Sequence, residues 1–218
     1  MEPSTRYADL TLAQFEEQLA SAAPVPGGGS ASAIAGSMAA SLLAMVSRLS
    51  TDRPKYADYA ATHARALAVA EDARPRLLNL ADDDATAFAA FAAARKMSRE
   101  TEAEQERREA ATHEAARQAS DIPLAVVRHC VAILESVEAM AGRSNLNASS
   151  DLEVAARLAG AAARGAAANV MINLPSVGDD RYAGATRLDV TELLESVDRL
   201  TAQVAQTVAA GSLREPEA

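Results

Sequence analysis

The chain has 218 residues, of which 49% are hydrophobic and only 3% aromatic, and its formal net charge is -9. This length allows one domain with a sizeable core. The acidic balance excludes a general nucleic-acid binder, because phosphate backbones require a basic face. Alanine is the commonest residue and favours helices over strands, so we expect a single-domain, all-α fold of about seven helices over residues 1–218.

The cysteine content and the N-terminal segment both indicate the cytoplasm. With one cysteine, Cys130, no internal disulfide forms, as is usual in a reducing compartment. The N-terminal residues lack the basic region and apolar run of a secretory signal. We therefore expect a cytoplasmic protein in which Cys130 is a small, buried side chain.

An amphipathic helix and a glycine-rich turn precede a helix without charge in its first part. The segment TLAQFEEQLASA places its large apolar side chains on one face, and APVPGGG then ends the helical pattern. The next helix is expected from Ser30, its candidate N-cap. It carries one stripe of large side chains, formed by Ile34, Met38, Leu42 and Met45. A second stripe consists of small residues, which are Ser32, Gly36 and Ala40. Two such stripes indicate packing on at least two sides, and the many Gly, Ser and Ala residues argue against a membrane span.

Helical patterns continue through the rest of the chain. The expected segments are 54–94, 101–120, 121–141, 152–174 and 188–210. We place a boundary between segments 101–120 and 121–141 because Pro123 follows it, and proline is typical of the first turn of a helix. The segment 101–120 is strongly charged and is expected to be a solvated helix.

The glycine-rich turn PVPGGGS is the first candidate for chemistry. It is no Walker loop, because no lysine follows, and no dinucleotide fingerprint, because no strand precedes it. The free N–H groups at the start of the following helix can hold a carboxylate, an oxyanion or a carbonyl. The same residues are also consistent with a tight turn that only lets two helices pack.

A second polar loop, NLNASSDLE, opens the alanine-rich helix. Ser150 and Glu153 have the spacing of a capping box, which places Asp151 in the first helical turn, where the helix dipole favours an acidic residue. A helix this apolar is expected to be buried, with its start open to a cleft. A buried Arg164 then needs an anionic partner, from the protein or from a ligand.

The remaining polar residues carry weaker signals. Asp84 precedes Phe88 by four residues on an alanine face, which alone is little evidence for a site. The three histidines lack metal-ligand spacing, so no metal is expected. No arrangement of Ser, His and Asp indicates an activated nucleophile.

Five segments together resemble one family, the formiminotransferase-cyclodeaminase C-terminal family, which includes stand-alone methenyltetrahydrofolate cyclohydrolases. They are APVPGGGSASAIAGSMAASLLAMV, KYAD, DDATAFAAF, ETEAEQERREAATHEAARQASDIPL and NLNASSDLEVAARLAGAAARGAAANVMINL. Their order and spacing agree from about Leu10 to Leu200. The resemblance implies an all-α homodimer that acts on folate without a metal and without a cofactor beyond the tetrahydrofolate that carries the substrate.

The resemblance also implies which residues lie near a folate cleft. They are Gly27, Gly28, Gly29 and Ser30 at the first loop, Asn147, Ser150 and Asp151 at the second, and Asp84. Where family members usually have Leu-Pro-Lys, this chain has Met97, Ser98 and Arg99. Arg99 keeps the positive charge but does not titrate near neutrality.

Two related reactions follow from the resemblance. In the cyclohydrolase reaction, water attacks the cationic methenyl carbon between N5 and N10 of the folate. In the cyclodeaminase reaction, N10 attacks the N5-formimino carbon and ammonia leaves. Both need a base, an acid and a nearby carboxylate, and we assign these roles to Asp151 first and Asp84 second. Arg99, in the place of the family's lysine, is the third expected catalytic residue. We also expect Lys55, Arg99 or Arg164 to bind the glutamate tail.

The alternative is a non-catalytic folate-binding protein, or a helical interaction module on the same scaffold, and the departure at Arg99 favours it. The enzymatic hypothesis requires one structural arrangement. The helix openings at Ser30 and Asp151 have to converge on one pocket, either within a chain or across two subunits.

Overall fold

The computed structural model describes residues 6–216, and within them it contains α-helices, short 3-10 helices and no strand. The α-helices are α1 (Leu12–Leu19), α2 (Gly28–Ser50), α3 (Ala60–Arg95), α4 (Glu102–Met140), α5 (Ser149–Asn173) and α6 (Asp180–Ala210). The 3-10 helices are η1 (Tyr7–Asp9), η2 (Pro54–Tyr59), η3 (Leu146–Ala148) and η4 (Leu174–Ser176). The expected all-α fold is confirmed.

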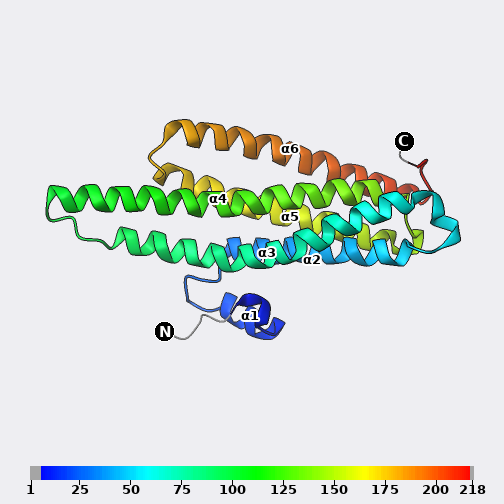
Figure 1. Cartoon of the computed structure of the whole chain (residues 1–218), viewed down its shortest axis with the longest axis horizontal. Helices are drawn as coiled ribbons and strands as arrows, with labels where there is room; N and C mark the ends of the chain where they lie inside the picture. Colours follow the sequence, from blue (N-terminus) through cyan, green and yellow to red (C-terminus); the bar gives the residue numbers. More distant parts are fainter. Residues whose placement is uncertain (1–5, 217–218) are drawn as a thin grey trace.

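Helix α4 is at the centre of the bundle and packs against α2, α3, α5 and α6. Helices α3 and α4 form a long hairpin whose closed end projects beyond the other helices, and α1 lies apart from the bundle (Figure 1). Helices α2 and α5 pack against each other along their lengths. The start of α2 and the end of α5 therefore lie at the same end of the bundle.

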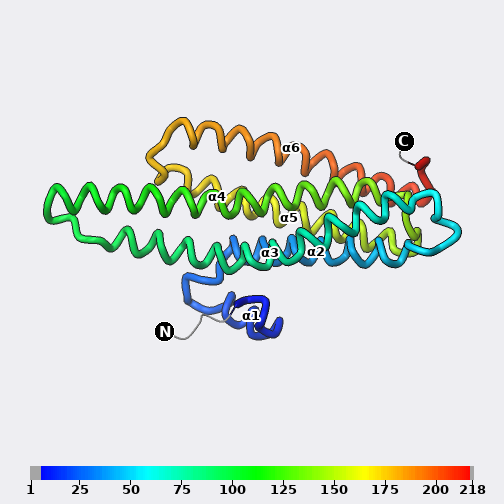
Figure 2. The backbone as a smooth tube through the Cα atoms, in the orientation of Figure 1, coloured from blue at the N-terminus to red at the C-terminus, as the bar shows by residue number. Residues whose placement is uncertain are grey.

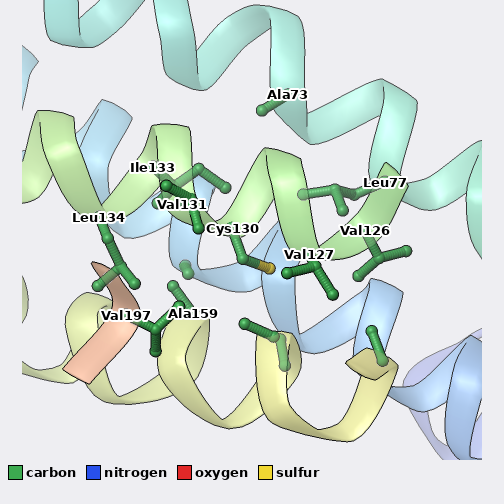
Figure 3. Packing of buried hydrophobic residues seen from close by; sticks show 14 of the residues in the cluster. Ala73, Leu77, Val126, Val127, Cys130, Val131, Ile133, Leu134, Ala159 and Val197 are labelled. Carbon is green, nitrogen blue, oxygen red and sulfur yellow. The ribbon is translucent and has the colours of Figure 1, made fainter. Parts of the chain in front are cut away.

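The core is built from small aliphatic side chains, as the composition requires. Figure 3 shows Cys130 between Val127 and Val131, near Leu77 of the neighbouring helix α3. Cys130 is fully buried, and burial raises the pKa of its thiol to about 12, so its expected role as a small buried side chain is confirmed. At Gly36 the backbone of α2 comes so close that an added Cβ would lie 3.1 Å from the sulfur of Cys130.

Only one of the two stripes on α2 is fully buried within the chain. The stripe of small side chains is buried against neighbouring helices. In the stripe of large side chains, Ile34 and Leu42 are partly buried against the core, whereas Met38 is 52% exposed and Met45 is 37% exposed. By length and hydropathy α2 is also long and apolar enough to cross a membrane, but 61% of that window is buried inside the bundle, as in the core helix of a helical protein.

The expected break before Pro123 is wrong, because α4 runs through it without interruption. Proline lacks the N–H that would bond to the backbone oxygen four residues earlier, here that of Ala119. That oxygen instead accepts a hydrogen bond of 2.7 Å from the side-chain amide of Asn173, at the end of α5. A tertiary contact thus replaces the missing helical bond, and six α-helices are described where seven were expected.

Three expected helix starts also differ from the structure. The last helix, expected from Leu188, begins at Asp180, where the side chain of Asp179 caps it by accepting from the backbone N–H of Tyr182. Gly27, not Ser30, is the N-cap of α2, and Ser30 is already inside the helix. Helix α5 begins at Ser149 with Ala148 as its N-cap, so the capping box expected from Ser150 does not form. Asp151 does lie in the first turn of α5, as expected.

Candidate active site

A pocket of about 410 Å³ lies where the start of α2, the second half of α3 and the end of α5 meet. Residues far apart in the sequence line it, and they are Pro24, Val25, Gly27, Gly28, Gly29, Asp84, Phe88, Phe91, Arg95, Ala119, Asn169, Ile172, Asn173 and Ser176. We call it the glycine-turn pocket. It contains the three glycines and Asp84, so the structure brings together two groups that the sequence analysis singled out separately.

Asp84 is the ionisable group closest to the glycine turn. Its Oδ2 accepts a hydrogen bond of 3.0 Å from the hydroxyl of Ser30, a residue that is itself fully buried. An added Cβ on Gly29 would lie 2.5 Å from Cγ of Asp84 and 2.6 Å from Oδ2, so only glycine lets the carboxyl come this close. The start of α2 thus holds a carboxylate, as the loop chemistry predicted, and the carboxylate belongs to the protein itself.

Burial raises the pKa of the Asp84 carboxyl above its usual range. Hydrogen bonds from the hydroxyl and the backbone N–H of Ser30 stabilise the charged form and oppose that rise. A carboxyl with a raised pKa takes up and releases a proton closer to neutrality than an exposed one does. Asp84 therefore has the properties of a general acid–base group.

The walls of the glycine-turn pocket suit a flat, polar ring. Phe88 and Phe91, two of the three phenylalanines of the chain, lie one helical turn apart on α3 and line one side. Asn169 and Asn173 of α5 also line the pocket, and their amide nitrogens donate to the backbone oxygens of Gly165 and Ala119. Phe88 is 43% exposed, although it is large and apolar, so it is open to a molecule that enters the pocket. Neither phenylalanine was expected as a site residue from the sequence.

A basic groove of about 560 Å³ continues from the glycine-turn pocket along the α3–α4 hairpin. It shares Phe91, Arg95 and Ser176 with that pocket and adds Arg99 and Arg108. The guanidinium of Arg108 donates to the backbone oxygen of Arg95 at 2.9 Å and 3.2 Å. Among the described residues, Arg95 and Arg99 form no ion pair. Their charge is thus available to an anion, in a protein that is acidic overall.

The expected site residues of the second polar loop lie at the opposite end of the bundle. Asp151 begins α5 and Asn169 lies near its end, so at about 1.5 Å per residue they are about 27 Å apart. Figure 2 shows α5 running the length of the bundle between these two ends. Asn147 and Ser150 adjoin Asp151, and within one chain none of these three reaches the glycine-turn pocket.

Lys55 belongs to this far end as well. It lies on η2 with its ammonium group 5.5 Å from the centre of the Tyr56 ring, and the Tyr56 hydroxyl accepts from the backbone N–H of Leu146, just before Asn147. Lys55, Asn147, Ser150 and Asp151 therefore form a second cluster, which we call the far-end cluster.

Arg164 belongs to neither cluster. The sequence analysis expected it to be buried, but half of its side chain is exposed on the side of α5 that faces α6. Its guanidinium pairs with Asp198 of α6 and donates to the backbone oxygen of Gly160 at 3.2 Å. The anionic partner that the sequence required is thus supplied by the protein.

This chain is similar to known proteins along most of its length. The family model described as formiminotransferase-cyclodeaminase matches residues 11–192. A methenyltetrahydrofolate cyclohydrolase of Methylorubrum extorquens is 36% identical over 91% of this chain and 95% of its own length. A formimidoyltransferase-cyclodeaminase of Sus scrofa is 33% identical over 93% of this chain, which spans only 37% of that longer relative.

A solved structure has a similar fold. The formiminotetrahydrofolate cyclodeaminase of Thermotoga maritima superimposes with a TM-score of 0.84 at 27% identity, covering 93% of this chain and 98% of that one. The match extends along the glycine turn, Asp84 and both polar loops, which all lie within residues 11–192. The chain therefore belongs to the formiminotransferase-cyclodeaminase family.

Proposed function

We propose that this protein is a folate one-carbon enzyme that hydrolyses 5,10-methenyltetrahydrofolate to 10-formyltetrahydrofolate. The observation that carries the proposal is the half-buried carboxyl of Asp84, held against the glycine turn in a pocket with aromatic and amide walls. The similarity to a cyclohydrolase along 95% of that relative's length supports this reaction.

Asp84 can serve the reaction in two ways. Its carboxylate attracts the cationic methenyl carbon, and this attraction is strong in a pocket that excludes most water. As water attacks that carbon, Asp84 accepts one of its protons and a C–O bond forms. The bond from carbon to N5 then breaks as N5 gains a proton, the carbon becomes the formyl group on N10, and one proton is released to solvent.

The cyclodeaminase reaction is the second candidate, and the structural likeness to a cyclodeaminase favours it. Here N10 attacks the N5-formimino carbon, Asp84 accepts the proton of N10, and the imino nitrogen is protonated and leaves as ammonia. The product is the methenyl bridge that the first reaction opens. One carboxyl can therefore support both steps.

The remaining walls fit the other parts of a folate. A pterin ring fits between Phe88 and Phe91 on one side and the backbone of the glycine turn on the other. The anionic glutamate tail fits the adjoining basic groove, where Arg95 and Arg99 present guanidinium groups suited to carboxylates. In this arrangement Arg99 binds the substrate's tail and needs no titration near neutrality.

We also propose that the active form is a homodimer in which the far-end cluster of one copy completes the pocket of the other. The exposed stripe on α2 is apolar and is centred on Met38, near the middle of the helix. When two such stripes pack antiparallel about a two-fold axis, the start of each α2 meets the end of the other. The end of α2 adjoins the far-end cluster, because Ser50 accepts from the backbone N–H of Asn145 at 2.9 Å.

This pairing places Asp151 of one copy near Asp84 of the other. A mixed dimer of Asp84→Asn and Asp151→Asn subunits would then hold one intact site and one doubly altered site. Refolding the two inactive variants together should restore about a quarter of wild-type turnover, since half of the dimers are mixed and each has one intact site. Mixing Asp84→Asn with the double variant should restore none, and equal results for the two mixtures would contradict the shared site.

The reaction itself is tested by following the loss of methenyltetrahydrofolate absorbance with the purified protein. In a parallel assay, ammonia release from 5-formiminotetrahydrofolate is measured. Turnover of the methenyl substrate above the spontaneous rate is expected. Tight folate binding without turnover of either substrate would contradict the enzymatic proposal and favour a non-catalytic folate-binding protein.

A further inference from the structure

The hydroxyl of Ser30 lies between two acceptors behind the carboxyl of Asp84. Its Oγ is 3.0 Å from the backbone oxygen of Ala81 and 3.0 Å from Oδ2 of Asp84. Ser30 is fully buried, and the wall of the glycine-turn pocket includes Asp84 but not Ser30. The serine therefore meets the carboxyl from the protein interior, while Asp84 is the group that faces the pocket.

The hydrogen-bonding capacity of a hydroxyl matches both protonation states of the carboxyl. A hydroxyl donates one proton and accepts through two lone pairs. When Asp84 is ionised it can only accept, and Ser30 donates to it. When Oδ2 carries a proton, that proton is donated to Oγ, and Ser30 turns its own proton towards the backbone oxygen of Ala81. Both states are hydrogen-bonded without displacement of a heavy atom.

We propose that Ser30 is a positioning residue whose hydroxyl rotates with the protonation state of Asp84, so that this carboxyl exchanges a proton without moving. The inference rests on the proposed function, in which Asp84 accepts a proton from the attacking water. The proton of Ser30 stays on its own oxygen throughout. The exchanged proton moves only between the water, Asp84 and N5 of the folate, and it turns between Ser30 and the pocket by rotation about the C–O bond of the protonated carboxyl.

Few other charged groups surround this pair. Burial, followed by the charges of Asp82 and Asp84, raises the pKa of the Tyr7 phenol on η1 above its usual value near 10, and a side-chain hydrogen bond with Ser30 opposes that rise. Arg95 lies on the same helix as Asp84, further along the pocket wall. Helix α5 presents the neutral amide of Asn169. Burial raises the pKa of the Asp84 carboxyl, and we therefore assign the acidic limb of the pH profile to this group.

Removing the hydroxyl tests the inference through the pH profile. Hydrogen bonds to the ionised carboxylate lower its pKa, so Ser30→Ala should raise the pKa of Asp84. We expect the acidic limb of kcat/KM to move to higher pH by about one unit or more. Ser30→Thr keeps a hydroxyl and should return the limb towards its wild-type position.

Ser37→Ala is the matched control. Ser37 is also buried on α2, and its hydroxyl also donates to a backbone oxygen of α3, that of Arg74, at 3.1 Å. It has no carboxyl partner, so its loss should leave the profile unchanged. The comparison separates the loss of a buried hydroxyl from the loss of contact with Asp84.

A second measurement does not depend on turnover. The titration of Asp84 is followed by carbon-13 NMR in the folate-free protein and assigned with Asp84→Asn. An unchanged titration in folded Ser30→Ala overturns the inference, whatever the kinetics. A shifted titration in a protein that converts neither folate supports the pairing of Ser30 with Asp84 and contradicts the proposed function instead. If Ser30→Ala does not fold, Ser30→Cys, with its weaker donor, should give a smaller shift in the same direction.

Discussion

Replacing Gly29 with alanine perturbs the closest contact in the glycine-turn pocket. The added Cβ would lie 2.5 Å from Cγ of Asp84, whereas ordinary contacts begin at 3.4 Å. The carboxyl has to move by about 1 Å, and a misplacement of that size costs about 100-fold in turnover. Stability should change much less, since the weakened contact at the helix start costs about 1 kcal/mol and alanine in a helix regains up to about 1 kcal/mol.

Two measurements separate these effects. The kcat/KM for methenyltetrahydrofolate reports the position of Asp84, and the urea midpoint reports stability. Gly184→Ala is the matched control, because nothing lies within 4 Å of the Cβ it adds on α6. If Gly29→Ala kept kcat/KM within about threefold of wild type, catalysis would not depend on the close contact between Asp84 and Gly29. That result would refute the predicted role of this contact.

Three further predictions concern single residues. Arg95→Gln should raise KM about tenfold for a folate with a glutamate tail and leave KM unchanged for a tail-less pterin analogue, as measured by steady-state kinetics. Asn173→Ala removes the donor to the backbone oxygen of Ala119 and should lower the free energy of unfolding by about 1 kcal/mol in urea, and an unchanged midpoint would contradict that role. Cys130 should react with a thiol reagent only after denaturation, because the native thiol is buried with a pKa of about 12, and rapid labelling of the native protein would contradict this.

Local sequence patterns predicted the helices well, because helical periodicity and capping are local properties. Helix α4, for example, was expected to begin near residue 101, and a capping box of Thr101 and Glu104 opens it there. The rule that fails is also local. Pro123 looks like a helix start because proline has no N–H to donate to the backbone oxygen of Ala119. Asn173, which donates to that oxygen instead, is 50 residues from Pro123 in the sequence. No local pattern contains that information.

In the candidate site, too, local features could be predicted from the sequence, and contacts between distant segments could not. Asp84 and the glycine turn could each be noticed in the sequence, but their contact depends on how α2 packs against α3. No sequence pattern predicted that Phe91 lines a pocket, since a phenylalanine in an alanine-rich helix also suits a core. The position of Asp151 at the far end of α5 follows from simple helix length, and this position is what requires a second copy in the proposed active form.

The most direct test of the central claim compares Asp84→Asn with Asp83→Asn. Asp83 is the neighbouring residue on α3 and is exposed, so both changes remove one charge from the same turn of helix. Asp84→Asn is expected to fold and to lose about 100-fold to 10,000-fold in kcat/KM for methenyltetrahydrofolate, whereas Asp83→Asn should match wild type. Equal activity of the two variants would contradict the account.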